Sequence, residues 1–334
     1  MTKYTIQYRQ MREEGMLEGE NLKSLLVRAM RLEVAGAQLG ANAKARIIDL
    51  DQDGTYVILN KISDPAAWDQ RFFAGQLIHL RRGADVAAVL QSLEDDTEEF
   101  LLEQVNIGED ASVLKGILYF ATVDNHLGLI EDQQVRGRTL ERYLTAVLQR
   151  ADLLEAGRAV VLNASFRAGD GKELAETSEV TIFADKNYGP AAAAAVAVVD
   201  QIVEDEVARL RREGASVFDV LRTLGWDEQA ITSLEGEVPN DGWIEGFFKV
   251  FIKTRRRRQP ISRATINEAL RNIDPQDIGL DGEGRERGGI VKLSTRKGIR
   301  TVGTLKDPAD AIEKIMQALQ EWAEAGKIDC AFDA

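Results

Sequence analysis

The clearest chemical pattern in the sequence is one basic segment, Ile244–Lys306. It holds 15 Lys+Arg against 7 Asp+Glu, a local balance of +8 in a chain of 334 residues with a net charge of −13. The four consecutive arginines Arg255–Arg258 repel one another unless nearby anions neutralise them. Guanidinium groups bind phosphate oxygens in a bidentate fork, and clustered cations are typical of nucleic-acid binding. We therefore predict a phosphate-binding surface here, although arginines paired with nearby carboxylates would also explain the run.

Further cations follow the arginine run and can line one groove with it. The candidate DNA-binding residues are Lys249, Lys253, Arg255, Arg256, Arg257, Arg258, Arg263, Arg285, Arg287, Arg296, Lys297 and Arg300. The phenylalanines among them have the spacing of core residues, so no ladder of exposed aromatics is available to stack single-stranded bases. No helix here has the pattern of a major-groove recognition helix. The segment thus predicts sequence-independent binding to duplex phosphates.

Catalytic patterns are weak by comparison. His79 alternates with leucines, which indicates a core or edge position, and His126 lies in a predicted hairpin turn, where we expect it to be solvent-exposed. A Gly-x-Ser-x-Gly motif is absent, and two histidines with the single Cys330 cannot form a Cys/His zinc site. We therefore predict no catalytic residue, metal or cofactor.

Two alternatives use the acidic residues instead. The cluster Glu94–Glu99 could hold Mg²⁺ in a nuclease, with Glu179, Asp185 and Lys186, or Glu94 with Lys115, as the candidate active-site residues. The same cluster could give a protein–protein interaction module an acidic face that mimics DNA. Neither spacing is distinctive, so both remain alternatives to DNA binding.

The expected compartment is the cytoplasm. One cysteine cannot form an internal disulfide, the first residues have no apolar signal-peptide region, and the longest apolar run is too short to span a membrane. The net charge of −13 by itself argues against a polyanion partner. Divided along the chain, it becomes +8 in the basic segment and −21 elsewhere, which confines the predicted DNA binding to one region.

Hydrophobic periodicity predicts alternating hairpins and helices in the first half. The expected elements are a helix at 20–32, a hairpin at 46–61, a strand at 76–80, a helix at 84–93, a strand at 100–107, a hairpin of 116–123 with 127–131, a helix at 139–151, and a hairpin of 159–167 with 179–183. This order favours an α+β fold of antiparallel hairpins packed with helices.

The second half repeats this order weakly, which suggests two related halves. It is expected to contain helices at 190–213, 217–224 and 228–234, a strand at 243–254, a helix at 263–273, a hairpin of 290–293 with 299–305 around a tip at 295–298, and a final helix. Asp307 as N-cap, Pro308 and Gly326 bound that last helix. We expect an N-terminal α+β half at 1–185, a helical arm at 186–240 and a C-terminal α+β half at 241–334. The alanine-rich start of the arm could cross to a partner in a homodimer.

This succession resembles the RexA-like phage-exclusion proteins, whose fold is similar to that of the ring-forming recombination protein RdgC. The stretches that carry the resemblance are 49–61, 116–130, 136–144, 216–236, 248–258 and the terminal helix. The resemblance implies a non-enzymatic homodimer that binds duplex DNA without sequence preference, senses an infecting phage and activates a RexB-like membrane channel. The basic stretch 253–258 is where this implication and the charge pattern coincide.

Overall fold

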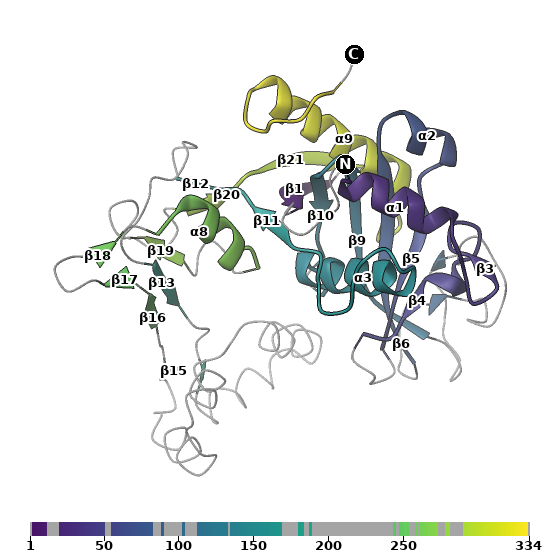
Figure 1. The fold of residues 1–334 in the computed structure, drawn as a ribbon, viewed down its shortest axis with the longest axis horizontal. Helices are drawn as coiled ribbons and strands as arrows, with labels where there is room; N and C mark the ends of the chain where they lie inside the picture. Colours follow the sequence, from purple (N-terminus) through teal and green to yellow (C-terminus); the bar gives the residue numbers. More distant parts are fainter. Residues whose placement is uncertain are drawn as a thin grey trace, which may run out of the picture. The chain divides into compact units, whose positions relative to one another are not determined.

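Two compact units make up the chain in the computed structural model (Figure 1). The structure describes residues 2–11, 20–50, 55–82, 88–89, 102–103, 112–132, 134–168, 180–183, 187–188, 243–244, 247–250, 252–253, 258–259, 261–272, 278–280 and 290–332. Unit 1 comprises Met1–Ser165 and Lys292–Ala334, and unit 2 comprises Phe166–Val291. The fold class is α+β, as predicted. Of the residues expected in a C-terminal half at 241–334, only Lys292–Ala334 groups with the N-terminal ones, and the predicted boundaries near 185 and 240 lie outside the described residues.

Unit 1 is built on one large antiparallel sheet. Its strands are β1 (Thr2–Met11), β4 (Ile47–Ile48), β5 (Thr55–Ile62), β6 (Phe73–Arg82), β7 (Ala88–Val89), β8 (Leu102–Glu103), β9 (Ser112–Val123), β10 (His126–Ile130), β11 (Leu162–Ala164) and β21 (Ser294–Ile299). The main order is β11-β1-β10-β9-β6-β5-β4, and β21 also pairs with β1. The predicted hairpins β4–β5 and β9–β10 are confirmed by their registers, Ile47 opposite Ile58 and His126 opposite Val123.

Short elements and helices complete unit 1. They are α1 (Leu22–Arg31), β2 (Glu33–Val34), β3 (Ala37–Gln38), the 3-10 helix η1 (Lys44–Arg46), α2 (Pro65–Gln70), α3 (Gly137–Arg150), β22 (Thr301–Val302), β23 (Leu305–Lys306) and α9 (Pro308–Glu324). Helix α9 begins and ends as predicted: the Asp307 side chain accepts hydrogen bonds from the amides of Ala309 and Asp310, and Gly326 has φ +64°.

Helices cover both faces of the sheet. Because side chains alternate along a strand, Leu118 and Phe120 of β9 pack with α1 and α3, whereas Tyr119 and Ala121 pack with α9. Figure 1 shows α1 and α3 running across the strands. Gly128 on β10 is closely covered, since a Cβ there would lie 2.5 Å from Cγ2 of Ile315 in α9.

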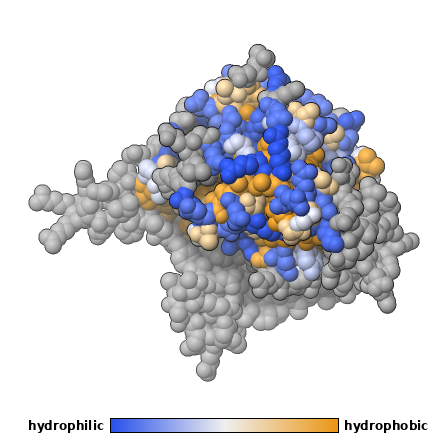
Figure 2. Space-filling model, turned by 45° about the vertical axis from the view of Figure 1, so that its right-hand side comes forward, coloured by the Kyte–Doolittle hydropathy of each residue, from blue (hydrophilic) through white to orange (hydrophobic). Residues whose placement is uncertain are grey.

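Few large apolar side chains are exposed among the described residues. Val302 is 77% exposed and Val291 40% exposed, and they are the exposed large hydrophobics of the described part. In the view of Figure 2, hydrophilic side chains cover much of the described surface, and hydrophobic ones show between them near the middle. Most apolar residues of unit 1 are therefore buried in its two hydrophobic cores.

Unit 2 leaves and rejoins unit 1 at one edge of the sheet. Residues 9–11 of β1 pair with β11, and residues 2–7 of the same strand pair with β21. Where the two meet, the amide of Leu293 donates to the carbonyl of Ser165 and the amide of Tyr8 donates to the carbonyl of Leu293. The whole of unit 2 is thus inserted between two segments that lie side by side.

Unit 2 is described only through short elements. They are β12 (Phe166–Ala168), β13 (Val180–Phe183), β14 (Asn187–Tyr188), β15 (Trp243–Ile244), β16 (Phe247–Val250), β17 (Ile252–Lys253), β18 (Arg258–Gln259), α8 (Arg263–Ala269), β19 (Ile278–Leu280) and β20 (Ile290–Lys292). Strand β13 lies between β16 and β19, β12 pairs with β20, β14 with β15, and β17 with β18. The predicted helices between 190 and 234 and the duplication into two related halves are not covered by these residues.

Three predicted elements are wrong. The segments 159–167 and 179–183 do not form a hairpin together, because β11 pairs with β1, β12 with β20, and β13 with β16 and β19. Residues 295–298 are not a hairpin tip: they lie within β21, and the tight hairpin is β22–β23, which turns at Gly303 with φ +61°. Ala88–Val89, expected in a helix, forms strand β7. In each case strand partners distant in sequence override the local pattern.

Candidate nucleic-acid interface

The predicted DNA-binding residues are divided between the two units. Lys249, Lys253, Arg258 and Arg263 belong to described elements of unit 2, and Arg296, Lys297 and Arg300 belong to unit 1. Arg255, Arg256, Arg257, Arg285 and Arg287 lie outside the described residues. A single groove lined by the whole set therefore stays a prediction.

The arginine run is flanked by two paired strands. Strands β17 and β18 are antiparallel, with Ile252 opposite Gln259 and Lys253 opposite Arg258. The connection between them is residues 254–257, so the run spans a hairpin connection and begins its return strand. A basic residue from each strand shares one register position, which brings the backbones of Lys253 and Arg258 together. Lys249 belongs to the neighbouring strand β16, where it lies opposite Thr181 of β13.

Two of the three candidates in unit 1 form ion pairs with helix α9 or its N-cap. Nζ of Lys297 contacts Glu321, while Arg300 lies 3.4 Å from Asp307 through Nη2 and 3.6 Å from Asp310 through Nε. The backbone amide of Arg300 also donates to Asp310 at 2.6 Å. These contacts fix α9 against β21, so Lys297 and Arg300 have structural partners that the sequence pattern did not reveal.

Arg296 and Arg263 remain exposed. Arg296 follows the alternation of β21 and therefore projects from the face opposite to Lys297, which contacts α9. Arg263 opens α8 directly after its N-cap Ser262, whose side chain accepts from the amide of Thr265. Both residues are exposed to solvent.

His126 is buried, which corrects the expectation that it is solvent-exposed. His126 is only 7% exposed, and its Nδ1 forms a 2.7 Å hydrogen bond with the hydroxyl of Tyr8. Burial raises the pKa of Tyr8, and the ring of Trp322 packs edge-on against it at 5.9 Å. The predicted turn at 124–125 is present, but Tyr8 of β1 and Trp322 of α9 cover the residue that follows it. His79 is partly buried in β6, as its pattern suggested.

A half-buried lysine is the second titratable feature that the sequence did not predict. Nζ of Lys306 lies 4.6 Å from the centre of the Tyr4 ring and 6.0 Å from that of Tyr119. Burial lowers the pKa of Lys306, and Asp132 opposes that change. Tyr119 accepts from Gln76 at 3.1 Å and donates to the carbonyl of Lys306 at 3.0 Å. These contacts hold the residues that precede α9 against the sheet. We therefore assign Lys306 and Tyr119 a structural role.

A partly buried polar cluster holds the start of α3. The carboxylate of Glu131 accepts from Gln7 and from the amide of Gly137, each at 2.8 Å, and Nη2 of the buried Arg9 lies 3.6 Å away. The cluster joins β1, β10 and the first turn of α3. Its groups bind one another and backbone, except Oε1 of Gln7, which is buried without a hydrogen-bond partner in the described part, and we assign the cluster to the fold.

The described residues contain no group of three or more His, Cys, Asp or Glu side chains that could hold a metal ion. Most candidate residues of the nuclease alternative lie outside the described part of the chain, namely 94–99, Glu179, Asp185 and Lys186. Lys115 is described and lies on β9. No helix in the described part is long and apolar enough to cross a membrane.

Comparison with known proteins gives no match: no family model, curated protein or solved structure matches the chain.

Proposed function

We propose that the protein is a non-enzymatic, sequence-independent binder of duplex DNA that uses its basic segment at 244–306. The observation that carries the proposal is the pairing of Lys253 with Arg258, which flanks the arginine run with two antiparallel strands. A two-stranded β-ribbon is narrow enough to enter the major groove of a duplex. Cations on such a ribbon reach phosphates on both sides of the groove and need no contact with a base edge.

The charge distribution supports local binding of limited strength. The basic segment carries +8, while the rest of the chain carries −21 and repels DNA. Two of its cations, Lys297 and Arg300, form ion pairs near α9, which leaves fewer for phosphates. The proposed contacts are therefore concentrated on unit 2, with Arg255–Arg258 at their centre.

The biological setting that we propose rests on the resemblance to RexA-like proteins. It places the protein in the cytoplasm as a homodimer that detects an infecting phage through DNA and activates a RexB-like membrane channel. Light scattering at micromolar concentration tests the dimer, and a monomeric mass would contradict it.

A binding assay across a salt series tests DNA binding directly. With about six phosphates neutralised, the logarithm of the binding constant falls against the logarithm of the salt concentration with a slope of about −5. Random duplexes of different sequence should bind equally. Absence of binding at low salt would overturn the proposal.

A pair of matched variants locates the binding. Replacing Arg255–Arg258 by serine should weaken binding at least tenfold and flatten the salt slope. Replacing four cations of unit 1, namely Lys3, Lys23, Arg138 and Lys327, by serine changes the net charge equally and should have a much smaller effect. Equal effects of the two variants would contradict the assignment to the arginine run. Plasmid DNA incubated for hours with the pure protein and Mg²⁺ should stay intact. Cleavage of the plasmid would favour the nuclease alternative.

A further inference from the structure

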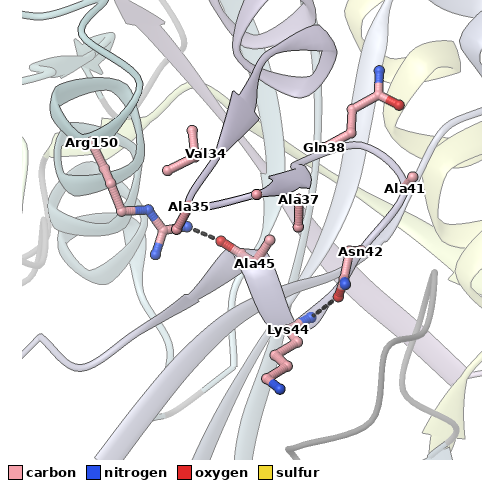
Figure 3. A pocket seen from close by; sticks show the side chains of 10 residues that line it. Val34, Ala35, Ala37, Gln38, Ala41, Asn42, Lys44, Ala45 and Arg150 are labelled. Atoms are coloured by element: carbon pink, nitrogen blue, oxygen red, sulfur yellow. Dashed lines mark hydrogen bonds between the residues drawn. The ribbon is translucent and has the colours of Figure 1, made fainter.

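An open hollow of about 810 Å³ lies beside the end of α3 in unit 1. Three parts of unit 1 line it: the β2–β3 hairpin, the segment leading into η1, and Arg150 from the last turn of α3 (Figure 3). The volume is within the range of small-molecule sites, about 300–1,000 Å³. It is therefore large enough for an organic ligand.

The charged residues that line this hollow are both cations. They are Lys44 and Arg150, and none of the ten lining residues, all within the described part, is acidic. The chain as a whole has a net charge of −13, so a lining without any carboxylate departs from its average composition. It favours an anion over a cation or a neutral ligand.

Arg150 is held by two backbone carbonyls and has further N–H donors. Its Nη1 donates to the carbonyl of Ile47 at 3.1 Å, and its Nη2 donates to the carbonyl of Ala45. A guanidinium has five N–H donors, so three remain for a ligand or for water. Partial burial lowers the pKa of Arg150, and Tyr143 opposes this change. Figure 3 shows this guanidinium reaching from α3 toward Ala35 and Ala45.

The remaining wall is made of small side chains. Val34 and four alanines leave room for a ligand, and the methyl group of Ala37 points toward Ala45 in Figure 3. The hairpin turn above them has Ala35 at φ 51° and Gly36 at φ 81°. The left-handed region is unfavourable for alanine, and asparagine or glycine is the usual choice at such a position. Residues held in sparsely populated backbone regions cluster at binding sites.

We propose that this hollow binds a small phosphorylated organic molecule. The guanidinium of Arg150 would bind the phosphate oxygens through the N–H donors that it does not give to the carbonyls of Ile47 and Ala45. The ammonium of Lys44 lies at another part of the rim and adds to the positive potential. The alanine methyl groups would pack against the organic part. This site is in unit 1, and its ligand is independent of the DNA proposed for unit 2.

Calorimetric titration of the full-length protein with adenosine 5′-monophosphate tests the proposal. Adenosine and inorganic phosphate serve as the two partial probes. We expect saturable binding of the monophosphate, at least tenfold weaker binding of phosphate, and no binding of adenosine. Absence of monophosphate binding at millimolar concentration, or equal binding of adenosine, would overturn the proposal. Equal binding of inorganic phosphate would also overturn it, because the apolar wall would then have no role.

Variants assign the binding to the hollow. Arg150→Gln should weaken binding at least tenfold, while Arg138→Gln removes the same charge from the exposed first turn of α3 and should have no effect. Because Arg150 also holds two carbonyls, Ala37→Phe provides a second variant that fills the hollow and keeps Arg150. Loss of binding in Ala37→Phe with an unchanged melting temperature supports the site. Unchanged affinity in Ala37→Phe overturns it, even if Arg150→Gln fails to fold.

Discussion

The backbone amide of Leu293 donates a 2.8 Å hydrogen bond to the carbonyl of Ser165, although all of unit 2 separates these residues in the sequence. Both residues lie along the same edge of β1, between the ends of β11 and β21. The two ends of the insertion are therefore already adjacent, so little loop-closure entropy is lost when they are joined directly.

Replacing residues 166–291 by a short Gly/Ser linker should leave unit 1 folded. Both hydrophobic cores of unit 1 are built from residues outside the deletion. We therefore expect the deletion variant to unfold cooperatively in urea, as measured by circular dichroism. The same variant should bind duplex DNA at least tenfold more weakly than the full chain at low salt. A deletion variant that binds as tightly as the full chain would remove unit 2 from the proposed interface.

The N-cap of α9 should contribute measurably to stability. The Asp307 side chain accepts from the amides of Ala309 at 3.0 Å and Asp310 at 3.3 Å. Asp307→Ala should lower the free energy of unfolding by about 1 kcal/mol in a denaturant titration. Asp307→Ser keeps a capping oxygen and should recover most of the loss. Equal stability of the alanine and serine variants would show that the cap contributes nothing.

Arg46 should be among the most sensitive positions of unit 1. Its side chain is fully buried and donates to the carbonyls of Leu39, Gly40 and Asn60 at 3.0, 3.1 and 2.8 Å. Arg46→Leu removes these donors from buried acceptors and should lower the free energy of unfolding by about 3 kcal/mol. The surface residue Arg142 donates to the carbonyl of Leu50 in a similar way. Arg142→Leu serves as the control and should cost less than about 1 kcal/mol; similar losses at both positions would contradict the role of burial.

Alkaline pH should destabilise the protein through its buried tyrosines. Burial raises the pKa of Tyr143 to about 12, against about 10 in the unfolded chain. Its hydroxyl donates to the carbonyl of Arg46 and accepts from the amide of Leu59. The neutral form is favoured in the folded state, so this contribution is complete below pH 10 and is lost as the pH rises toward 12.

Urea unfolding at pH 9, 10 and 11 measures this loss. We expect the free energy of unfolding to fall across this series, and Tyr143→Phe to fall less steeply because one ionising group is gone. An identical slope in both proteins would mean that Tyr143 titrates alike in the folded and unfolded states.

Local signals predicted much of unit 1. The cap residues of α9 were evident because Asp, Pro and Gly act within one turn of the helix they bound. The β9–β10 hairpin followed from its turn, where Asp124 has φ 50°. The second role of that turn was not evident: the side chain of Asn125 accepts from the amide of Leu22 and anchors α1. Such a contact depends on tertiary structure, which spacing along the chain does not encode.

Non-local pairing explains what the sequence did not predict. The apolar pattern of β11, β12 and β13 indicated strands but not their separate partners. The burial of His126 required Tyr8 and Trp322, which come from opposite ends of the chain. The hollow beside Arg150 likewise arises from segments that have no common motif. The basic segment, in contrast, was evident because charge is additive along a sequence.

The order of synthesis gives α9 a particular importance. Ile315, Leu319 and Trp322 cover the face of the sheet formed by Ile6, Tyr8 and Tyr119. The ribosome makes these sheet residues early and α9 only after all of unit 2. Until then that face has no cover, so a nascent chain stalled within unit 2 should bind a chaperone that recognises apolar strands. Unit 1 is therefore begun first and completed last.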